Sequence, residues 1–128
     1  MMYDSTGGDT LAARRLTTLV VDDERDLANV AAELLNYHGI DALVAYSAYE
    51  ALQVMKGRAD IDAIFSDVTM PLMDGLELAD IVAKTYPAVK IVLTSGFAAH
   101  TCLKQTTWPY RFAKKPYSID TVIQLLRC

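Results

Sequence analysis

Five polar side chains stand at the ends of four short apolar runs in this chain. They are Asp22, Asp23, Asp67, Thr94 and Lys115. Apolar runs of this length, separated by helical patterns, are typical of buried parallel strands, and ligands of such sheets bind at the carboxyl ends of the strands. If the runs belong to one sheet, three carboxylates, one hydroxyl and one ammonium converge on a single edge. That set of groups suits a cation and a phosphoryl group.

The two adjacent acids alone do not identify a site, because Asp22-Asp23-Glu24 also fits a helix start, where carboxylates favour the positive end of the helix dipole. The third acid, Asp67, favours a site. Like charges about 4 Å apart repel by a few kcal/mol at an effective dielectric near 20, so such a cluster raises its pKa values or binds a cation. Oxygen ligands suit Mg2+. Lys115 fits either an ordinary counter-ion of the cluster or a phosphoryl-binding group.

The segments between these residues predict five strands that alternate with five helices. Strands are expected near residues 17–22, 40–46, 61–66, 89–93 and 111–114. The helices are expected to end at Gly39, to open at Ser47, to cover 75–85 and 97–108, and to follow Ser118. The expected buried stripes are Leu27, Val30, Ala31 and Leu34 in the first helix, Ala48, Ala51, Leu52 and Met55 in the second, and Ile119, Val122, Ile123 and Leu126 in the last.

This alternation predicts an α/β fold with a doubly wound, five-stranded parallel sheet and helices on both faces. The flavodoxin-like strand order 2-1-3-4-5 is the common solution at this size. In that order the first and third strands are neighbours, so the three acids meet where they end. We expect residues 1–15 to form a polar leader and residues 16–128 to form one domain.

Composition excludes several classes of function. The chain has 128 residues, of which 52% are hydrophobic. This is enough apolar surface for one core that needs no disulfide or structural metal. A net charge of -4 and a pI near 5.0 argue against direct binding to nucleic acid or anionic lipid. No apolar stretch reaches the roughly 18 residues of a membrane span. Two cysteines without a paired spacing fit a reducing compartment, so we expect a cytoplasmic protein with no membrane partner.

Four motifs in order resemble those of the receiver domain of bacterial two-component response regulators. They are Leu19-Val20-Val21-Asp22-Asp23-Glu24, Ser66-Asp67-Val68-Thr69-Met70-Pro71 with Asp74-Gly75, Val92-Leu93-Thr94-Ser95-Gly96, and Lys115-Pro116-Tyr117. The similarity covers roughly residues 16–127. Each motif alone is weak, but four of them at the right spacing are specific.

The resemblance implies a role for each acid of the cluster. Asp67 corresponds to the phosphoacceptor, and Asp23 and Asp67 correspond to the direct carboxylate ligands of Mg2+. Asp22 would act on the cation through water, and Thr69 would offer its backbone carbonyl.

The resemblance also implies roles for the last two motifs. Thr94 corresponds to the hydroxyl that turns toward the phosphoryl group, and Lys115 to the lysine that pairs with it. Phe112 corresponds to the aromatic switch position. The peptide bond before Pro116 is expected to be cis.

By the same resemblance, the chain is the phosphoacceptor of a two-component or phosphorelay system. It would take a phosphoryl group from a sensor histidine kinase or a histidine phosphotransfer protein, and then bind a partner or relay the phosphate. It would catalyse only its own phosphorylation and dephosphorylation. A downstream protein is expected on the face of the fourth helix, fifth strand and fifth helix, around Trp108, Tyr110 and Tyr117.

Two other functions fit a similar topology less well. A Mg2+-dependent aspartyl-phosphate hydrolase would share the nucleophilic aspartate and the metal. Such hydrolases typically carry a second aspartate two residues after the nucleophile, where this chain has Thr69. A flavin-binding module needs a hydroxyl- and glycine-rich phosphate loop after the first strand, and Asp22-Asp23-Glu24 has the wrong charge for one.

Overall fold

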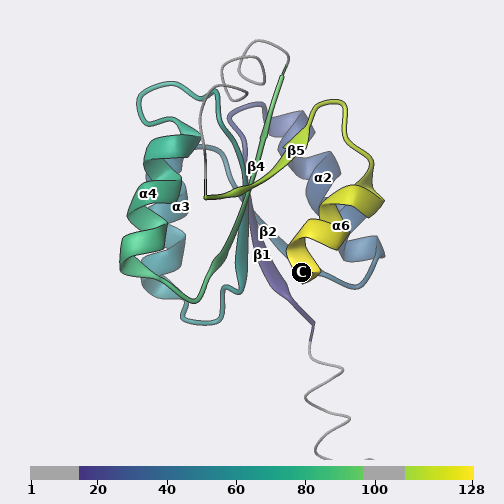
Figure 1. The fold of residues 1–128 in the computed structure, drawn as a ribbon, viewed down its shortest axis with the longest axis horizontal. Helices are drawn as coiled ribbons and strands as arrows, with labels where there is room; N and C mark the ends of the chain where they lie inside the picture. Colours follow the sequence, from purple (N-terminus) through teal and green to yellow (C-terminus); the bar gives the residue numbers. More distant parts are fainter. Residues whose placement is uncertain (1–14, 97–108) are drawn as a thin grey trace, which may run out of the picture.

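The computed structural model describes residues 15–96 and 109–128, and within these ranges five strands alternate with four helices (Figure 1). In chain order the elements are β1 (Thr17–Val21), α2 (Arg25–Tyr37), β2 (Asp41–Ala45), α3 (Ala48–Gly57), β3 (Ala63–Asp67), α4 (Gly75–Thr85), β4 (Lys90–Ser95), β5 (Arg111–Lys114) and α6 (Ile119–Arg127). The helix expected over 97–108 lies outside the described residues, as does Trp108.

The sheet has the order β2-β1-β3-β4-β5, and all four neighbouring pairs are parallel. The predicted fold class and strand order are therefore confirmed. The register aligns the strand ends, because Val21 lies opposite Ser66 and Asp67 lies opposite Thr94. The polar residues that follow these strands consequently share the carboxyl edge of the sheet.

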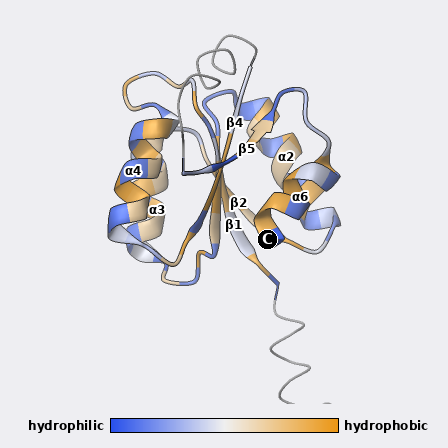
Figure 2. Ribbon diagram, viewed as in Figure 1, coloured by the Kyte–Doolittle hydropathy of each residue, from blue (hydrophilic) through white to orange (hydrophobic). Residues whose placement is uncertain are grey.

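Two helices cover each face of the sheet, with α3 and α4 on one face and α2 and α6 on the other (Figure 1). Each face buries its own apolar cluster. One contains Leu19, Ile64 and Leu93, and the other contains Val20, Phe65 and Val92. Adjacent strand residues thus enter opposite clusters, as the two-residue period of a strand requires. Figure 2 shows apolar and polar residues interspersed along α4 and α6, as in amphipathic helices with one buried side.

The buried stripe expected for the first helix is wrong at three of its four positions, and only Ala31 is buried as expected. The side that packs in α2 consists of Ala28, Ala31, Ala32 and Leu35. Leu27, Val30 and Leu34 are 45%, 53% and 42% exposed. The expected residues and the residues that pack both have the i, i+3, i+4, i+7 spacing, so periodicity alone does not separate the two sets. Three of the four packed residues are alanines, whose small side chains need little space between a helix and a sheet.

The stripes expected in the other two helices are confirmed. Ala48, Ala51 and Met55 are buried in α3, and Val122 and Leu126 are buried in α6. Serine side chains begin both helices: the Ser47 hydroxyl accepts from the Glu50 N–H, and the Ser118 hydroxyl accepts from the Thr121 N–H. Gly39 follows α2 with φ +89°, a conformation that glycine adopts without strain.

Candidate functional site

Three carboxylates meet at the carboxyl edge of the sheet. Asp22 and Asp23 follow β1, and Asp67 is the last residue of β3. One oxygen from each lies within 4.8 Å of the others. Asp22 and Asp67 are buried and Asp23 is exposed. The turn into α2 holds Asp22, because its backbone N–H donates to the Ala45 carbonyl and its Oδ1 accepts from the Glu24 N–H.

This gathering of acids changes the proton affinity of Asp22. Burial raises the pKa of its carboxyl, and the neighbouring charges of Asp67 and Asp23 raise it further, while the hydrogen bond from Glu24 and the charge of Lys115 oppose the shift. An ionised Asp22 therefore costs the folded protein free energy unless a cation compensates.

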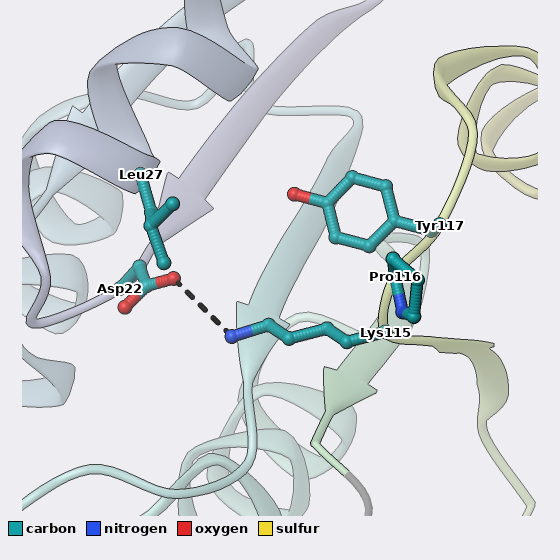
Figure 3. Close-up of a pocket in the computed structure, with 5 residues that line it drawn as sticks. All are labelled: Asp22, Leu27, Lys115, Pro116 and Tyr117. Atoms are coloured by element: carbon teal, nitrogen blue, oxygen red, sulfur yellow. Dashed lines mark ion pairs between the residues drawn. The ribbon is translucent and has the colours of Figure 1, made fainter.

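Lys115 supplies one compensating charge. Its Nζ lies 3.2 Å from Asp67 Oδ2 and 3.9 Å from Asp22 Oδ2, and the second pair is drawn in Figure 3. Burial lowers the pKa of the Lys115 ammonium, but the charge and hydrogen bond of Asp67 and the charge of Asp22 outweigh it and raise the pKa overall. The Lys115 N–H donates to the Ser95 carbonyl at the end of β4, and the bond to Pro116 is cis.

Thr94 and Thr69 lie on either side of Asp67. Thr94 is opposite Asp67 in the sheet, is 3% exposed, and its hydroxyl oxygen has no hydrogen-bond partner among the described residues. A buried hydroxyl without a partner costs free energy, so its position needs an explanation. Thr69 is exposed in the loop after β3, and its N–H donates to Asp67 Oδ1 at 3.3 Å.

The loop between β3 and α4 packs tightly under the phosphoacceptor candidate. A Cβ on Gly75 would lie 2.2 Å from the Asp67 carbonyl oxygen, and the Gly75 N–H donates to the Val68 carbonyl. Asp74 begins α4 with a full capping box shared with Glu77. Sequence reasoning quoted Asp74-Gly75 as a motif without finding this close approach, which depends on tertiary packing.

A cavity of about 400 Å3 opens beside the cluster, lined by Asp22, Leu27, Lys115, Pro116 and Tyr117 (Figure 3). The Tyr117 ring packs edge-on against Phe65, with centroids 5.3 Å apart. Burial raises the pKa of the Tyr117 phenol. Sequence reasoning assigned Leu27 to the core and Tyr117 to a partner surface, and so missed this cavity.

Phe112 in β5 and Tyr110 just before it belong to the opposite face of the sheet from Tyr117. Phe112 lies opposite Leu93, and both Phe112 and Tyr110 pack against the cluster beneath α3 and α4. The Tyr110 hydroxyl donates to an Asp80 carboxylate oxygen on α4. Burial and this hydrogen bond raise the pKa of Tyr110 to about 12. Tyr117 packs with the other cluster.

The donor set fits a hard divalent cation. Carboxylate oxygens are the ligands that Mg2+ takes, and three of them from two strands lie close enough to surround one site. The adjacent Lys115 ammonium and the Thr94 hydroxyl, which has no partner in the described part of the chain, suit phosphoryl oxygens.

Comparison with known proteins identifies the family. The family described as response regulator receiver domain matches residues 18–127. The chain belongs to this family. Receiver domains are signalling domains of two-component systems rather than enzymes with separate substrates.

Individual relatives agree with the assignment. The nitrogen assimilation regulatory protein NtrX of Azorhizobium caulinodans is 33% identical over 111 residues, and the sensor kinase CckA of Brucella abortus is 32% identical over 106 residues. These alignments cover 82% and 80% of this receiver domain chain, but only 24% and 11% of the relatives.

Solved receiver domains have the same fold. A response regulator receiver protein from Sinorhizobium medicae superimposes with a TM-score of 0.76 at 26% identity, covering 90% of this chain and 97% of that one. The receiver domain of the hybrid histidine kinase CckA gives a TM-score of 0.70 at 28% identity, covering 87% and 95%. Among the described helices of this receiver domain, none has the length and apolar character needed to cross a membrane.

Proposed function

We propose that Asp67 accepts a phosphoryl group from a phosphohistidine. A carboxylate oxygen of Asp67 attacks phosphorus, the new O–P bond forms as the P–N bond breaks, and the electron pair of the broken bond stays with the imidazole. The observation that carries the proposal is the Lys115 ammonium, 3.2 Å from Asp67 Oδ2 at the shared strand edge. It would pair with the transferred phosphoryl oxygens.

We propose that Asp23 and Asp67 bind Mg2+ directly, that Asp22 acts through water, and that Thr69 contributes its backbone carbonyl. The mutual approach of the three carboxylates within 4.8 Å supports the ligand set. When bound, Mg2+ would neutralise the charge that gathers as the phosphoryl group approaches.

The same site would act as a switch. The buried Thr94 hydroxyl has no partner among the described residues, and a phosphoryl oxygen on Asp67, directly opposite in the sheet, would accept its hydrogen bond. Movement of Thr94 would change the space beside Phe112, the expected aromatic switch residue on the neighbouring strand. The phosphorylated domain would then bind a downstream protein or pass the phosphate on.

The expected donor is a sensor histidine kinase or a histidine phosphotransfer protein, and the expected location is the cytoplasm. The relatives are consistent with either partner binding or phosphate relay as the output, since NtrX is described as a regulatory protein and CckA as a sensor kinase. We propose that a downstream partner binds the expected face of the fourth helix, fifth strand and fifth helix. Tyr110 and Tyr117 pack in clusters on opposite faces of the sheet, so they would border this surface from its two sides.

Incubation with acetyl phosphate and Mg2+, followed by mapping of the adduct by mass spectrometry, tests the assignment. We expect one phosphoryl group on Asp67, none in Asp67→Asn, and normal labelling in Asp26→Asn, whose exposed acid lies in the first turn of α2 outside the cluster. Equal labelling of Asp67→Asn and the wild type would contradict the proposal. Hydrogen exchange on the phosphorylated sample would then locate the face that changes.

A further inference from the structure

The cavity beside the acidic cluster has a composition that the proposed phosphorylation site does not require. Its volume of about 400 Å3 lies in the range of small-ligand pockets. Leu27, Pro116 and Tyr117 form apolar walls, while Asp22 and Lys115 form a charged side (Figure 3). Lys115 Nζ in turn lies 3.2 Å from Asp67 Oδ2. A molecule in this cavity would therefore touch both an apolar wall and the Lys115 ammonium that pairs with Asp67.

The Tyr117 side chain is held so that its hydroxyl faces the cavity. Its ring packs edge-on against Phe65, with an interplanar angle of 81°. Figure 3 shows the hydroxyl pointing across the cavity toward Leu27 and Asp22. A fixed hydroxyl on an apolar wall gives a binding site direction as well as surface.

We propose that this cavity holds the leaving group of the phosphodonor, a flat nitrogen heterocycle, and that Tyr117 is a specificity-determining residue. The inference rests on the proposed function of Asp67. The apolar walls suit the faces of an imidazole ring, and the phenolic oxygen of Tyr117 accepts a hydrogen bond from the ring N–H. The charged side contains both the Asp22 carboxylate and the Lys115 ammonium, so discrimination between leaving groups rests on the apolar walls and the Tyr117 hydroxyl.

The transfer balances without a proton from the protein. In a phosphoimidazole whose second ring nitrogen carries a proton, the P–N bond breaks as the bond from phosphorus to the Asp67 oxygen forms. The electron pair of the broken bond stays on the ring nitrogen. The imidazole then leaves as a neutral molecule that keeps its N–H bond to Tyr117.

The readout is the ratio of the Asp67 phosphorylation rate with N-phosphoimidazole to the rate with acetyl phosphate, both with Mg2+. In Tyr117→Phe, which keeps the ring against Phe65, the ratio should fall about fivefold, the effect of one ordinary hydrogen bond. Leu27→Trp should lower the ratio further by filling the cavity. The matched control is Val30→Trp, which places the same large side chain at a 53% exposed position of α2 that does not line the cavity, and it should leave the ratio at the wild-type value.

The results distinguish the leaving-group site from the phosphoacceptor role of Asp67. If both donors phosphorylate the wild type and Tyr117→Phe keeps the wild-type ratio, or slows both donors equally, the leaving-group site is wrong and the function of Asp67 stands. The same holds if Val30→Trp lowers the ratio as much as Leu27→Trp. If neither donor labels Asp67, both claims are wrong.

Discussion

The two edges of the sheet handle polar groups in opposite ways. At the amino edge, unlike groups are paired: Asp62 Oδ2 accepts from the Thr17 N–H at 2.8 Å, and Lys90 Nζ donates to the Leu126 carbonyl at 3.2 Å. At the carboxyl edge, three carboxylates gather, Lys115 offsets the charge of two of them only in part, and the buried Thr94 hydroxyl has no partner among the described residues. The amino edge therefore stabilises the fold. The carboxyl edge holds carboxylates and a hydroxyl that we propose to bind a cation and a phosphoryl group.

The largest expected effect of a single substitution lies at the carboxyl edge. In Gly75→Ala the new Cβ would lie 2.2 Å from the Asp67 carbonyl oxygen, so backbone must move. We expect a loss at the upper end of the about 1–3 kcal/mol that over-packing costs, together with slower phosphorylation of Asp67. The control is Gly57→Ala, where a Cβ meets no atom of the described residues within 4 Å. Urea unfolding and acetyl phosphate labelling measure both effects, and equal behaviour of the two variants would refute the close-packing argument.

A substitution at the amino edge should affect stability alone. Asp62 joins the starts of three strands, because its side chain accepts from the Thr17 N–H, its N–H donates to the Thr17 carbonyl, and its carbonyl accepts from the Lys90 N–H. Asp62→Ala leaves the Thr17 N–H without its acceptor and should cost about 1–2 kcal/mol. Asp62→Asn keeps an acceptor and should cost less. Slower phosphorylation of the refolded Asp62→Ala protein would show that the two edges are not separate.

The pH dependence of stability should reveal the cost of the acidic cluster. Burial raises the pKa of Asp22 above its ordinary value of 3.8 in the folded protein. A raised carboxyl pKa contributes stability that is fully present below 3.8 and is lost as pH rises through the folded-state pKa. In metal-free protein, Asp22→Asn should therefore gain stability relative to the wild type as pH rises from 3 to 7. Urea titrations across about pH 3–7 measure this, and a constant difference would contradict the cause we assign.

Local patterns predicted the strands and the polar edge, and the strand order followed from the order that is common for a fold of this size. Apolar runs of strand length set the β positions, and parallel pairing places their ends together whatever the details of packing. Asp22, Asp67 and Lys115 could be placed near one another on that basis alone.

Features that depend on contacts between distant segments were not predictable in this way. Leu27 and Ala28 both fit a helical stripe, and only the gap between α2 and the sheet decides which is buried. The contact of Tyr117 with Phe65 joins residues far apart in the chain, so the spacing of residues in the sequence does not predict the cavity. The contact that excludes a side chain at Gly75 comes from backbone eight residues earlier, folded back beneath the loop.

The stabilisation of the protein by Mg2+ tests the central contrast between the two edges most directly. Unfolding free energies should be measured with and without Mg2+ for the wild type, Asp23→Asn and the control Asp26→Asn. A cation that binds only the folded state adds RT ln(1 + [Mg2+]/Kd), so Mg2+ should stabilise the wild type and Asp26→Asn alike. Asp23→Asn should lose most of this gain. If Mg2+ does not stabilise the wild type, or stabilises Asp23→Asn equally, the carboxyl edge is not the cation site that the account requires.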